Sequence, residues 1–519
     1  MRKNKGVIAA GNEQTVQVAE EILRSGGNAF DAAIAAHLAA CITEPVLSSP
    51  GGGGFMLART PEGTQTLYDF FVHTPRHRRN PDEVEFYPIS ADFGEALQEF
   101  HIGMGSAAVP GTVRGLFAIH RDLCRMPMKQ LAAPAIEFAR NGVALNHFQA
   151  YILDIVKPVF MATEGSMRIY GRPEQEGGLL KEGQLLHQPD MADFLDVLAT
   201  EGEDFFYRGE FAGVVDRLCR EQGGHLTRED FESYEVIRRK PLMMTYRDAA
   251  RIALNPAPSS GGMLIAFALK LMEDSDPAGE PFGSARHLLR LASVQQQTEL
   301  ARVDYLMHNN EPVPGEGMLK SSYVEKFRRE VVGNPRFNRG TTHISIMDAD
   351  GNTASLTTSN GEGCGRIIPE TGIMLNNMLG EEDLHPAGFH NWPTDKRITS
   401  MMTPGVVTMK NGSVMALGSG GSNRIRTAIL QVILNLTDYG MSPEEAVSSP
   451  RLHCEKDFLS IEHGFDRSAL EPVLKAWPDH RIWGASNLFF GGVHSVMDGP
   501  DGFHGVGDAR RGGVARVVR

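Results

Sequence analysis

Apolar side chains recur at helical spacing through the first two thirds of the chain. Over residues 14–25 the positions of valine, isoleucine and leucine predict an amphipathic helix that ends at Gly26. A second helix, rich in alanine, is expected over residues 29–42, and the region 116–242 is expected to be mainly helical. After a break at PAPSSGG, the spacing predicts one more helix over residues 263–272.

The spacing changes in the last third of the chain, where short runs of apolar and β-branched residues predict strands. These runs cover residues 343–347, 353–358, 372–375, 405–409 and 413–417. The sequence DADGN joins the first two as a hairpin, since Asp-Gly and Gly-Asn accept positive φ. A helix is expected over residues 424–439. A helical first part and a strand-rich second part predict an α+β fold with a layered core.

Four consecutive glycines, residues 51–54, stand between the second predicted helix and the next apolar run. Glycine permits positive φ and close approach of the backbone. A glycine run also suggests phosphate binding, but no Lys-Ser or Lys-Thr pair follows, so a P-loop is not indicated. We expect a turn that packs tightly inside the fold.

Composition excludes some classes of protein. The chain has 519 residues and a formal net charge of −13, without the basic face that nucleic-acid binding requires. The N-terminal basic residues are not followed by an apolar stretch of signal-peptide length, and no apolar run is long enough to span a membrane. We therefore expect neither a nucleic-acid nor a membrane partner, and a cytoplasmic location for the chain as given.

The five cysteines are scattered, without the spacing of a metal site or a disulfide framework. This usage is typical of a reducing compartment. Cys364, in a glycine-rich segment, is a candidate nucleophile, although a small buried thiol is the commoner role for such a residue.

The candidate chemistry lies where Thr341 and Thr342 open a predicted strand directly after Gly340. A threonine hydroxyl is a weak nucleophile, but an N-terminal threonine carries its own base, an α-amine with a pKa near 8. To create that amine, the Thr341 hydroxyl would attack the Gly340 carbonyl, and water would hydrolyse the resulting ester. Gly340 can hold the bend that brings these groups together. Because threonine is also common in strands, the pair alone is not diagnostic.

Separated segments of the chain together resemble the gamma-glutamyltranspeptidase family. They occur in the family's order, as GGNAFDAAIAAHLAACITEP (26–45), GGGGFML (51–57), VPGTVRGL (109–116), PAPSSGG (256–262), TTHISIMDADGN (341–352), TGIMLNNM (371–378), TSMMTP (399–404) and GSGGSNRI (418–425). The resemblance implies the four-layer αββα sandwich of N-terminal-nucleophile hydrolases. It also implies self-cleavage into intertwined subunits, 1–340 and 341–519, that form a heterodimer. No metal or organic cofactor is implied.

The resemblance also implies roles for residues of the reaction centre. Thr341 would be the nucleophile, its amine the base, and Ser359 the hydroxyl that supports it. The oxyanion would be bound by the backbone N–H groups of Gly420 and Gly421, or of Gly421 and Ser422 if the alignment slides by one residue. A base role for the neighbouring histidine of the TTH motif is not needed, and a structural role is expected for it.

The substrate pocket is where the chain departs from the family pattern. Thr399 and Ser400 stand where hydroxyls hold the substrate carboxylate. The family arginine that clamps the α-carboxylate is replaced by Phe71, and phenylalanine cannot make a bidentate ion pair. The residues that bind the α-amine would be Glu381 or Glu382.

Two further differences concern the surroundings of this pocket. Asn360 lies one residue before the position expected for the family's asparagine, which Gly361 occupies. The stretch 381–399 is shorter than in members with a closing lid, so an open site is expected. Three arginines, Arg76, Arg78 and Arg79, are candidates to replace the missing clamp.

Three functions follow from these observations. The first is hydrolysis or transfer of gamma-glutamyl groups from small-molecule amides to water, an amine or a peptide. The second, favoured by Phe71, is an acylase with a different acyl group, similar to the glutaryl and cephalosporin acylases. The third is an uncleaved binding or scaffold relative, which we expect to lack the nucleophile or the glycine donors. The acyl donor, the acceptor and any assembly beyond the heterodimer stay open at this point.

Overall fold

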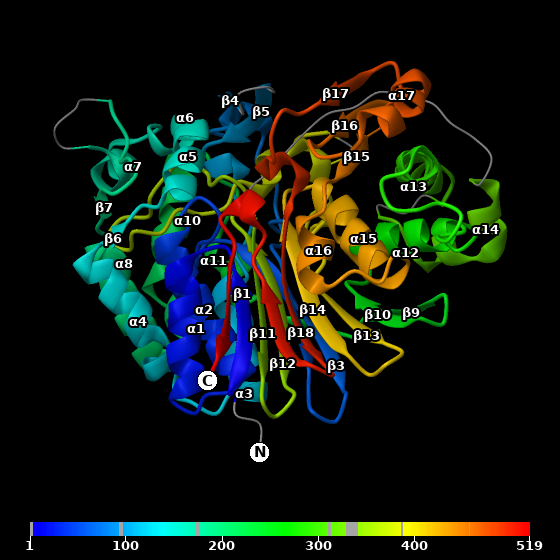
Figure 1. The fold of residues 1–519 in the computed structure, drawn as a ribbon. Coiled ribbons are helices and arrows are strands. Elements are labelled where there is room, and N and C mark those ends of the chain that lie inside the picture. The colour runs from blue at the N-terminus through cyan, green and yellow to red at the C-terminus, as the bar shows by residue number, and fades with distance from the viewer. Residues whose placement is uncertain are drawn as a thin grey trace.

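Two antiparallel sheets lie face to face at the centre of the molecule, with helices on both outer sides (Figure 1). The computed structural model describes residues 4–92, 97–172, 177–309, 313–327, 341–385, 388–455 and 457–519. The first sheet has the order β20 (Val514–Val518), β1 (Gly6–Ala10), β11 (Thr342–Asp348), β12 (Thr353–Ser359), β2 (Gly53–Arg59), β3 (Gln65–Phe70) and β8 (Ile237–Arg239). The second has the order β19 (Gly502–Val506), β18 (Gly492–Gly499), β14 (Val414–Gly420), β13 (Gly405–Met409), β10 (Ala250–Leu254) and β9 (Leu242–Tyr246).

Helices from the first half of the chain lie on the side of the first sheet (Figure 1). They are α1 (Glu13–Arg24), α2 (Ala29–Thr43), α3 (Thr112–Leu123), α4 (Met128–Asn141), α5 (His147–Ile155), α6 (Lys157–Phe160), α7 (Glu164–Tyr170), α8 (Pro189–Glu201), α9 (Glu203–Tyr207), α10 (Glu210–Gln222) and α11 (Arg228–Glu232). The other outer layer contains α12 (Gly261–Met272), α13 (Ala285–Asn309), α14 (Ser321–Lys326), α15 (Arg424–Thr437), α16 (Pro443–Ser448) and α17 (Arg467–Ala476). Both large sheets contain strands from before and after Thr341, so neither segment has a core of its own.

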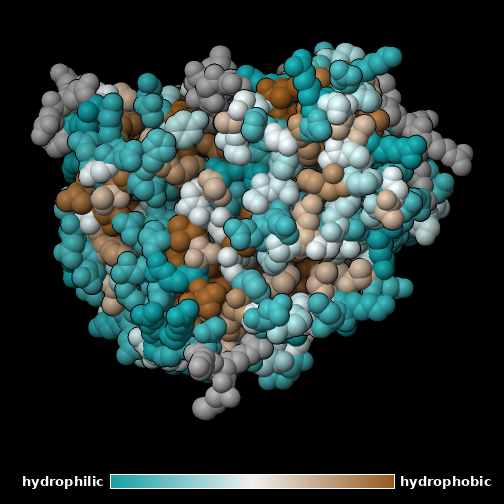
Figure 2. Space-filling model, in the orientation of Figure 1, coloured by the Kyte–Doolittle hydropathy of each residue, from teal (hydrophilic) through white to brown (hydrophobic). Residues whose placement is uncertain are grey.

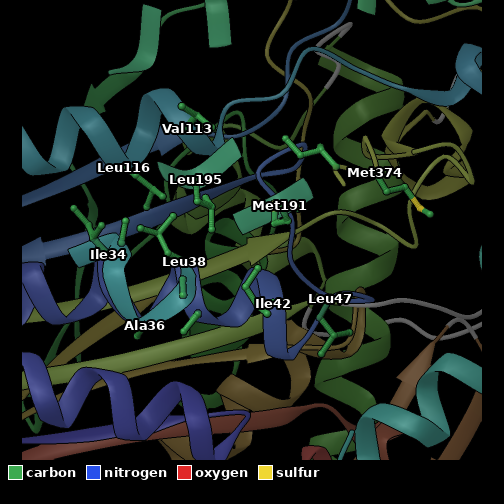
Figure 3. Close-up of a cluster of buried hydrophobic side chains, with 14 of the residues drawn as sticks. Ile34, Ala36, Leu38, Ile42, Leu47, Val113, Leu116, Met191, Leu195 and Met374 are labelled. Carbon is green, nitrogen blue, oxygen red and sulfur yellow. The ribbon is translucent and has the colours of Figure 1, made fainter. Parts of the chain in front are cut away.

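Helix α2 is apolar on all sides and entirely buried, as is expected for a helix inside a large core. Its Asn28 side chain accepts hydrogen bonds from the N–H groups of Phe30 and Asp31, which completes a capping box at the N-terminus. Figure 3 shows Ile34, Leu38 and Ile42 of this helix among side chains from the surrounding layer. The helix therefore forms a rigid support behind the first sheet.

Strand β11 is central in the first sheet, and its alternation assigns its side chains to two layers. Ile344 and Ile346 belong to the apolar cluster shared with α2. Met347 belongs to a smaller cluster between the two sheets. On that inner face, the Ser345 hydroxyl donates a hydrogen bond to the carbonyl of His494 on β18. By the same alternation Thr341 shares the inner face, where the sheets meet.

One expected strand is absent from the described residues. Residues 372–375 form only an isolated bridge, Ile367↔Met374, within a loop that pairs with itself. Gly363, Gly365 and Gly372 all have positive φ there, and this breaks the extended backbone that a continuous ladder needs. The expected strand at residues 405–409 is β13 with the same bounds.

Three smaller sheets lie outside the two large ones. They consist of β15 (Leu452–Glu455), β16 (Phe458–Ile461) and β17 (His480–Ile482), of β4 (Tyr87–Asp92) and β5 (Leu97–Ile102), and of β6 (Val143–Ala144) and β7 (Leu185–Leu186).

The surface in Figure 2 is mostly hydrophilic, with apolar residues in separate patches. None of the helices in the described ranges combines the length and the apolar character needed to cross a membrane.

A buried ion-pair network anchors the C-terminal segment beside β18. The Asp508 carboxylate accepts hydrogen bonds from Arg451 at 2.7 Å and from the Val493 N–H at 2.9 Å. Arg510 bonds both Asp508, at 3.2 Å, and Glu462, at 2.6 Å. Burial opposes ionisation of Asp508, but the two guanidinium groups hold its pKa at about 2.

Replacing Asp508 with alanine is expected to lower the free energy of unfolding by about 3–5 kcal/mol, because two buried guanidinium groups lose a partner. Since the folded-state pKa is depressed, this contribution is present above pH 3.8 and is lost as the pH falls through about 2. Urea denaturation in the Thr341→Ala background measures the change on a single chain. Asp501→Ala, at an exposed turn, is the control; an equal loss in both variants would contradict the role of the network.

Candidate active site

A pocket opens between the two sheets, where β11 begins and where β12 and β14 end. It contains about 460 Å³ of space between atoms, part of which is open to solvent. Its lining comes from segments far apart in the chain, namely Phe71, Thr341, Ser359, Met378, Glu381, Leu384, Thr399, Ser400, Met401, Met402, Ser422 and Ile425. Seven of the residues singled out in the sequence, among them Thr341 and Ser359, thus line one pocket.

Thr341 directly precedes β11 at the base of this pocket and is 5% exposed. The pairing of Thr342 with Thr358 in the neighbouring strand places Thr341 opposite Ser359. Ser359 in turn accepts a hydrogen bond from the Gly361 N–H at 3.0 Å, which orients its hydroxyl. Gly340, the other residue of the expected cleavage position, lies outside the described residues.

Thr342 faces the opposite side of the sheet. Its hydroxyl donates a hydrogen bond of 2.8 Å to Glu44, the residue that follows α2, and Thr15 donates another of 3.1 Å to the same carboxyl. Burial raises the pKa of Glu44 to about 7, against the effect of these two hydrogen bonds. Glu44 therefore holds the first residue of β11 from the face of the sheet opposite the Thr341 side chain, a role that its sequence position did not reveal.

The turn Gly420–Ser422 touches the backbone of the candidate nucleophile. A Cβ built on Gly420 would overlap the carbonyl oxygen of Thr341, so only glycine fits. Gly421 has φ +121° and Ser422 has φ +50°, and α15 begins two residues later, at Arg424. The start of a helix presents backbone N–H donors. This turn is therefore placed to bind a negative charge that develops beside Thr341.

Thr399 and Ser400 are held at the pocket by two serines of the PAPSSGG segment. The Ser259 hydroxyl donates a hydrogen bond to the Ser400 carbonyl at 2.7 Å, and Ser260 lies 3.0 Å from the Thr399 hydroxyl. Ser400 also accepts a hydrogen bond from the Met402 N–H at 3.1 Å. The hydroxyl proton of Ser400 can thus be donated to a bound substrate.

Phe71 lies on the pocket wall, stacked on Phe55 with 5.5 Å between ring centroids. Arg397 lies behind it and bonds the Phe71 carbonyl and the Tyr234 hydroxyl rather than the pocket. No lysine or arginine is among the described residues that line the pocket. The pocket wall at the position of the family arginine is therefore apolar.

The three arginines considered as replacements are bound elsewhere. Arg76 donates to Glu229 at 2.9 Å, Arg78 to the carbonyl of His390 at 2.8 Å, and Arg79 to the carbonyl of Cys219 at 3.0 Å. None of the three lines the pocket. The stretch 381–399, which was expected to be too short for a closing lid, lies beside residues 72–75 near its C-terminal end, where the Lys396 N–H donates a hydrogen bond to the Thr74 hydroxyl.

Of the two candidate acids, Glu381 lines the pocket, whereas Glu382 begins a 3₁₀ turn and is exposed. Asn360 is buried and donates to the carbonyl of Met374 at 3.3 Å, so it does not line the pocket either. The neighbouring Gly361 has φ +62°, and a Cβ there would overlap the Asn377 and Glu381 side chains. The position expected for the family's asparagine is thus too close to Asn377 and Glu381 to hold any side chain.

Two alternatives for the nucleophile chemistry have other surroundings. The ring of His343 lies 2.7 Å from the Thr357 hydroxyl and 2.8 Å from that of Ser345, between the sheets. Burial lowers its pKa well below the ordinary value. Cys364 is buried away from the pocket, and burial raises its pKa to about 11. Neither residue is placed to attack a substrate in the pocket.

Comparison with known proteins identifies the family of the chain. The family described as Gamma-glutamyltranspeptidase matches residues 15–518. The chain belongs to this family. As a gamma-glutamyltranspeptidase relative it is an enzyme of the N-terminal-nucleophile type, and the expected family is confirmed.

Proteins of both expected kinds are similar to this chain. The chain is 31% identical to a glutathione hydrolase proenzyme of Escherichia coli, over 98% of this chain and 91% of that protein. It is 27% identical to an acylase ACY 1 proenzyme of Pseudomonas sp. strain V22, over 96% of this chain and 91% of that protein. A cephalosporin acylase structure from Bacillus halodurans superposes with a TM-score of 0.80 at 22% identity, covering 99% and 96% of the two chains. The expected αββα fold is confirmed.

Proposed function

We propose that this enzyme cleaves itself before Thr341 and then hydrolyses amides through an ester on the Thr341 hydroxyl, with a preference for acyl chains that lack an α-carboxylate. The observation that carries the proposal is the composition of the pocket. Thr341, Ser359 and the Gly420–Ser422 turn meet on one side of it, and an apolar wall around Phe71 forms another.

The chemistry requires one proton carrier, the Thr341 α-amine. It takes the hydroxyl proton as the oxygen attacks the substrate carbonyl, and it gives that proton to the leaving amine as the amide bond breaks. Backbone N–H groups of the Gly420–Ser422 turn would stabilise the oxyanion formed between these events. Water then attacks the ester and passes a proton to the amine, which gives that proton to the Thr341 oxygen as the ester bond breaks and the acid is released.

The acyl preference follows from charge. An α-carboxylate in the pocket would lose its hydration shell without a guanidinium partner, because Phe71 replaces the family arginine and the nearby arginines bind elsewhere. The acid that lines the pocket, Glu381, would repel a second carboxylate and attract an ammonium group. Met378, Met401 and Met402 offer apolar contact to a methylene chain.

A second candidate, hydrolysis or transfer of gamma-glutamyl groups, is favoured by a different observation. Glu381 lies where it can bind the α-amine, and Thr399 and Ser400 still offer hydroxyls to a carboxylate. The glutathione hydrolase proenzymes among the relatives support the same substrate class. In this case binding of the α-carboxylate would depend on hydroxyl donors alone.

Four p-nitroanilides separate the candidates, because together they add and remove each charge of the acyl group. The gamma-glutamyl compound has an amine and a carboxylate, the 4-aminobutyryl compound only the amine, the glutaryl compound only the carboxylate, and the butyryl compound neither. We expect the highest kcat/KM for the 4-aminobutyryl compound and the lowest for glutaryl. A preference for the gamma-glutamyl compound would favour the second candidate, and a preference for glutaryl would reject the charge argument.

Substituting arginine for Phe71 is expected to lower KM for gamma-glutamyl-p-nitroanilide by about tenfold, since a charged hydrogen bond contributes about 1.5–3 kcal/mol. The butyryl compound, which has no carboxylate, is not expected to gain. Phe71→Met, which keeps the wall apolar, is the matched control. Equal changes for both substrates, measured by steady-state kinetics, would contradict a carboxylate-specific effect.

A further inference from the structure

Arg511 is a buried cation at the backbone of the nucleophile. It ends the 3₁₀ turn Ala509–Arg511, and its side chain lies across Gly492 of β18. One guanidinium nitrogen donates to the carbonyl oxygen of Thr341 at 3.4 Å, and the other to the carbonyl of Leu488 at 3.4 Å. Within the described part of the chain, no carboxylate lies within salt-bridge distance of this side chain.

The same guanidinium lies against Gly420 and Gly421 of the Gly420–Ser422 turn. A Cβ built on Gly420 would lie 3.1 Å from its first nitrogen, and one on Gly421 would lie 3.2 Å from its second. Arg511 therefore contacts the Thr341 carbonyl and both glycines at once. Arg510, the preceding residue, is fixed by Asp508 and Glu462, so the turn that presents Arg511 is rigidly anchored.

We propose that Arg511 is a positioning residue that keeps the α-amine of mature Thr341 neutral and holds the Gly420–Gly421 turn against the Thr341 carbonyl. The proposal rests on the function proposed above. The amine and the carbonyl oxygen of one residue are three bonds apart, which places the amine roughly 4–7 Å from the guanidinium. A like charge at that distance disfavours the protonated amine.

Other charged or titratable groups lie on the elements around Thr341 and Arg511. They are Glu44 after α2, His494 on β18, Arg424 at the start of α15, Asp508 before the Arg511 turn, and Glu381 in the pocket. His494 stays neutral at working pH, because burial lowers its pKa to about 4. Asp508 is neutralised by Arg451 and Arg510. Arg424 donates to the Phe489 carbonyl at 3.1 Å and acts in the same direction as Arg511.

Glu44 acts in the opposite direction, because its ionised form would favour a protonated amine. Burial raises its pKa to about 7, so it carries little charge below that pH. Near neutral pH Glu44 is thus only partly ionised, and it offsets the effect of the Arg511 charge in part. The ordinary pKa of an α-amine, about 7.7–8.0, would leave most of it protonated at neutral pH.

The experiment is the pH dependence of kcat/KM for purified, self-cleaved enzyme, whose acidic limb reports the amine in the free enzyme. Arg511→Met is expected to move that limb up by about one pH unit. Arg511→Lys is expected to keep it near the wild-type position, and Glu44→Gln to leave it unchanged or lower it. Mass-spectrometric reductive methylation of the Thr341 amine at several pH values gives the same pKa without turnover.

An Arg511→Met enzyme with lower kcat but an unmoved limb would overturn the electrostatic role and leave only a structural one. A limb that moves equally in the Met and Lys variants would also overturn it. If the Met variant does not cleave itself, Arg511→Gln against Arg511→Lys decides by the same readout. Failure of the wild type to cleave itself or to hydrolyse any anilide would reject the proposed function instead.

Discussion

The Thr341→Ala variant is expected to remain a single chain of 56.8 kDa without measurable amide hydrolysis. Wild-type protein is expected to yield two fragments of roughly 37 and 20 kDa, the smaller beginning at Thr341. Both effects have one cause, since the same hydroxyl attacks the Gly340 carbonyl during maturation and the substrate carbonyl afterwards. The loss of hydrolysis is expected to exceed about 10³-fold, as for other enzymes that lose their nucleophile. A denaturing gel, intact mass and an anilide assay measure these outcomes.

Two further substitutions, one at Thr341 and one at Thr342, control this experiment. Thr341→Ser retains a hydroxyl and is expected to cleave itself, more slowly. Thr342→Ala removes the adjacent hydroxyl, which faces Glu44 on the opposite side of the sheet, and is expected to cleave itself as well. Cleavage that continues in Thr341→Ala, or that stops only in Thr342→Ala, would place the nucleophile elsewhere. A single full-length band in the wild type as well would favour the uncleaved scaffold alternative.

Much of the layered fold could be predicted from local patterns. The alternation after residue 341 and the DADGN turn predict β11 and β12, which the structure contains with nearly the expected bounds. The expected strand at 372–375 is wrong, because positive-φ glycines at 363, 365 and 372 bend the backbone. Apolar content alone does not distinguish a buried loop from a buried strand.

Only some of the residues that line the pocket could be predicted from the sequence. Polar residues such as Thr341, Ser359 and Glu381 were identified because they fall on family motifs. The apolar lining, for example Met378 and Ile425, has no motif and is assembled only when distant segments meet. A choice such as Glu381 over Glu382 depends on the direction of a short 3₁₀ turn, which composition does not determine.

The buried residues that contact the site without lining the pocket were not predicted from the sequence. Arg511 belongs to the sequence DARRGG, which has the composition of a solvated loop, yet its side chain is only 4% exposed. Glu44 likewise follows a helix in a segment that suggested a simple helix end. Both become significant only through contacts with residues about 300 and 170 positions away, such as Glu44 with Thr342 and Arg511 with Thr341. Local pattern contains no information on such pairs.

The Gly420→Ala variant is expected to lose about 10²–10³-fold in kcat and to slow or block self-cleavage. Its added methyl group would overlap the carbonyl oxygen of Thr341 and press on Arg511. The backbone has no room to move toward β18, because Gly420 pairs with Gly492 and a Cβ there would already overlap the Arg511 side chain. The substitution therefore displaces the nucleophile and the oxyanion donors together, although it removes no hydrogen-bond donor.

Self-cleavage rate, kcat and the thermal unfolding midpoint should be measured together. Gly484→Ala is a matched control, because nothing lies within 4 Å of a Cβ at that position and its φ is not in the positive range. We expect normal cleavage and turnover in the control, and a defect in Gly420→Ala much larger than its loss of stability. Full activity in Gly420→Ala would show that the turn does not bind the oxyanion, since a displacement of about 1 Å already costs such sites roughly a hundredfold in rate.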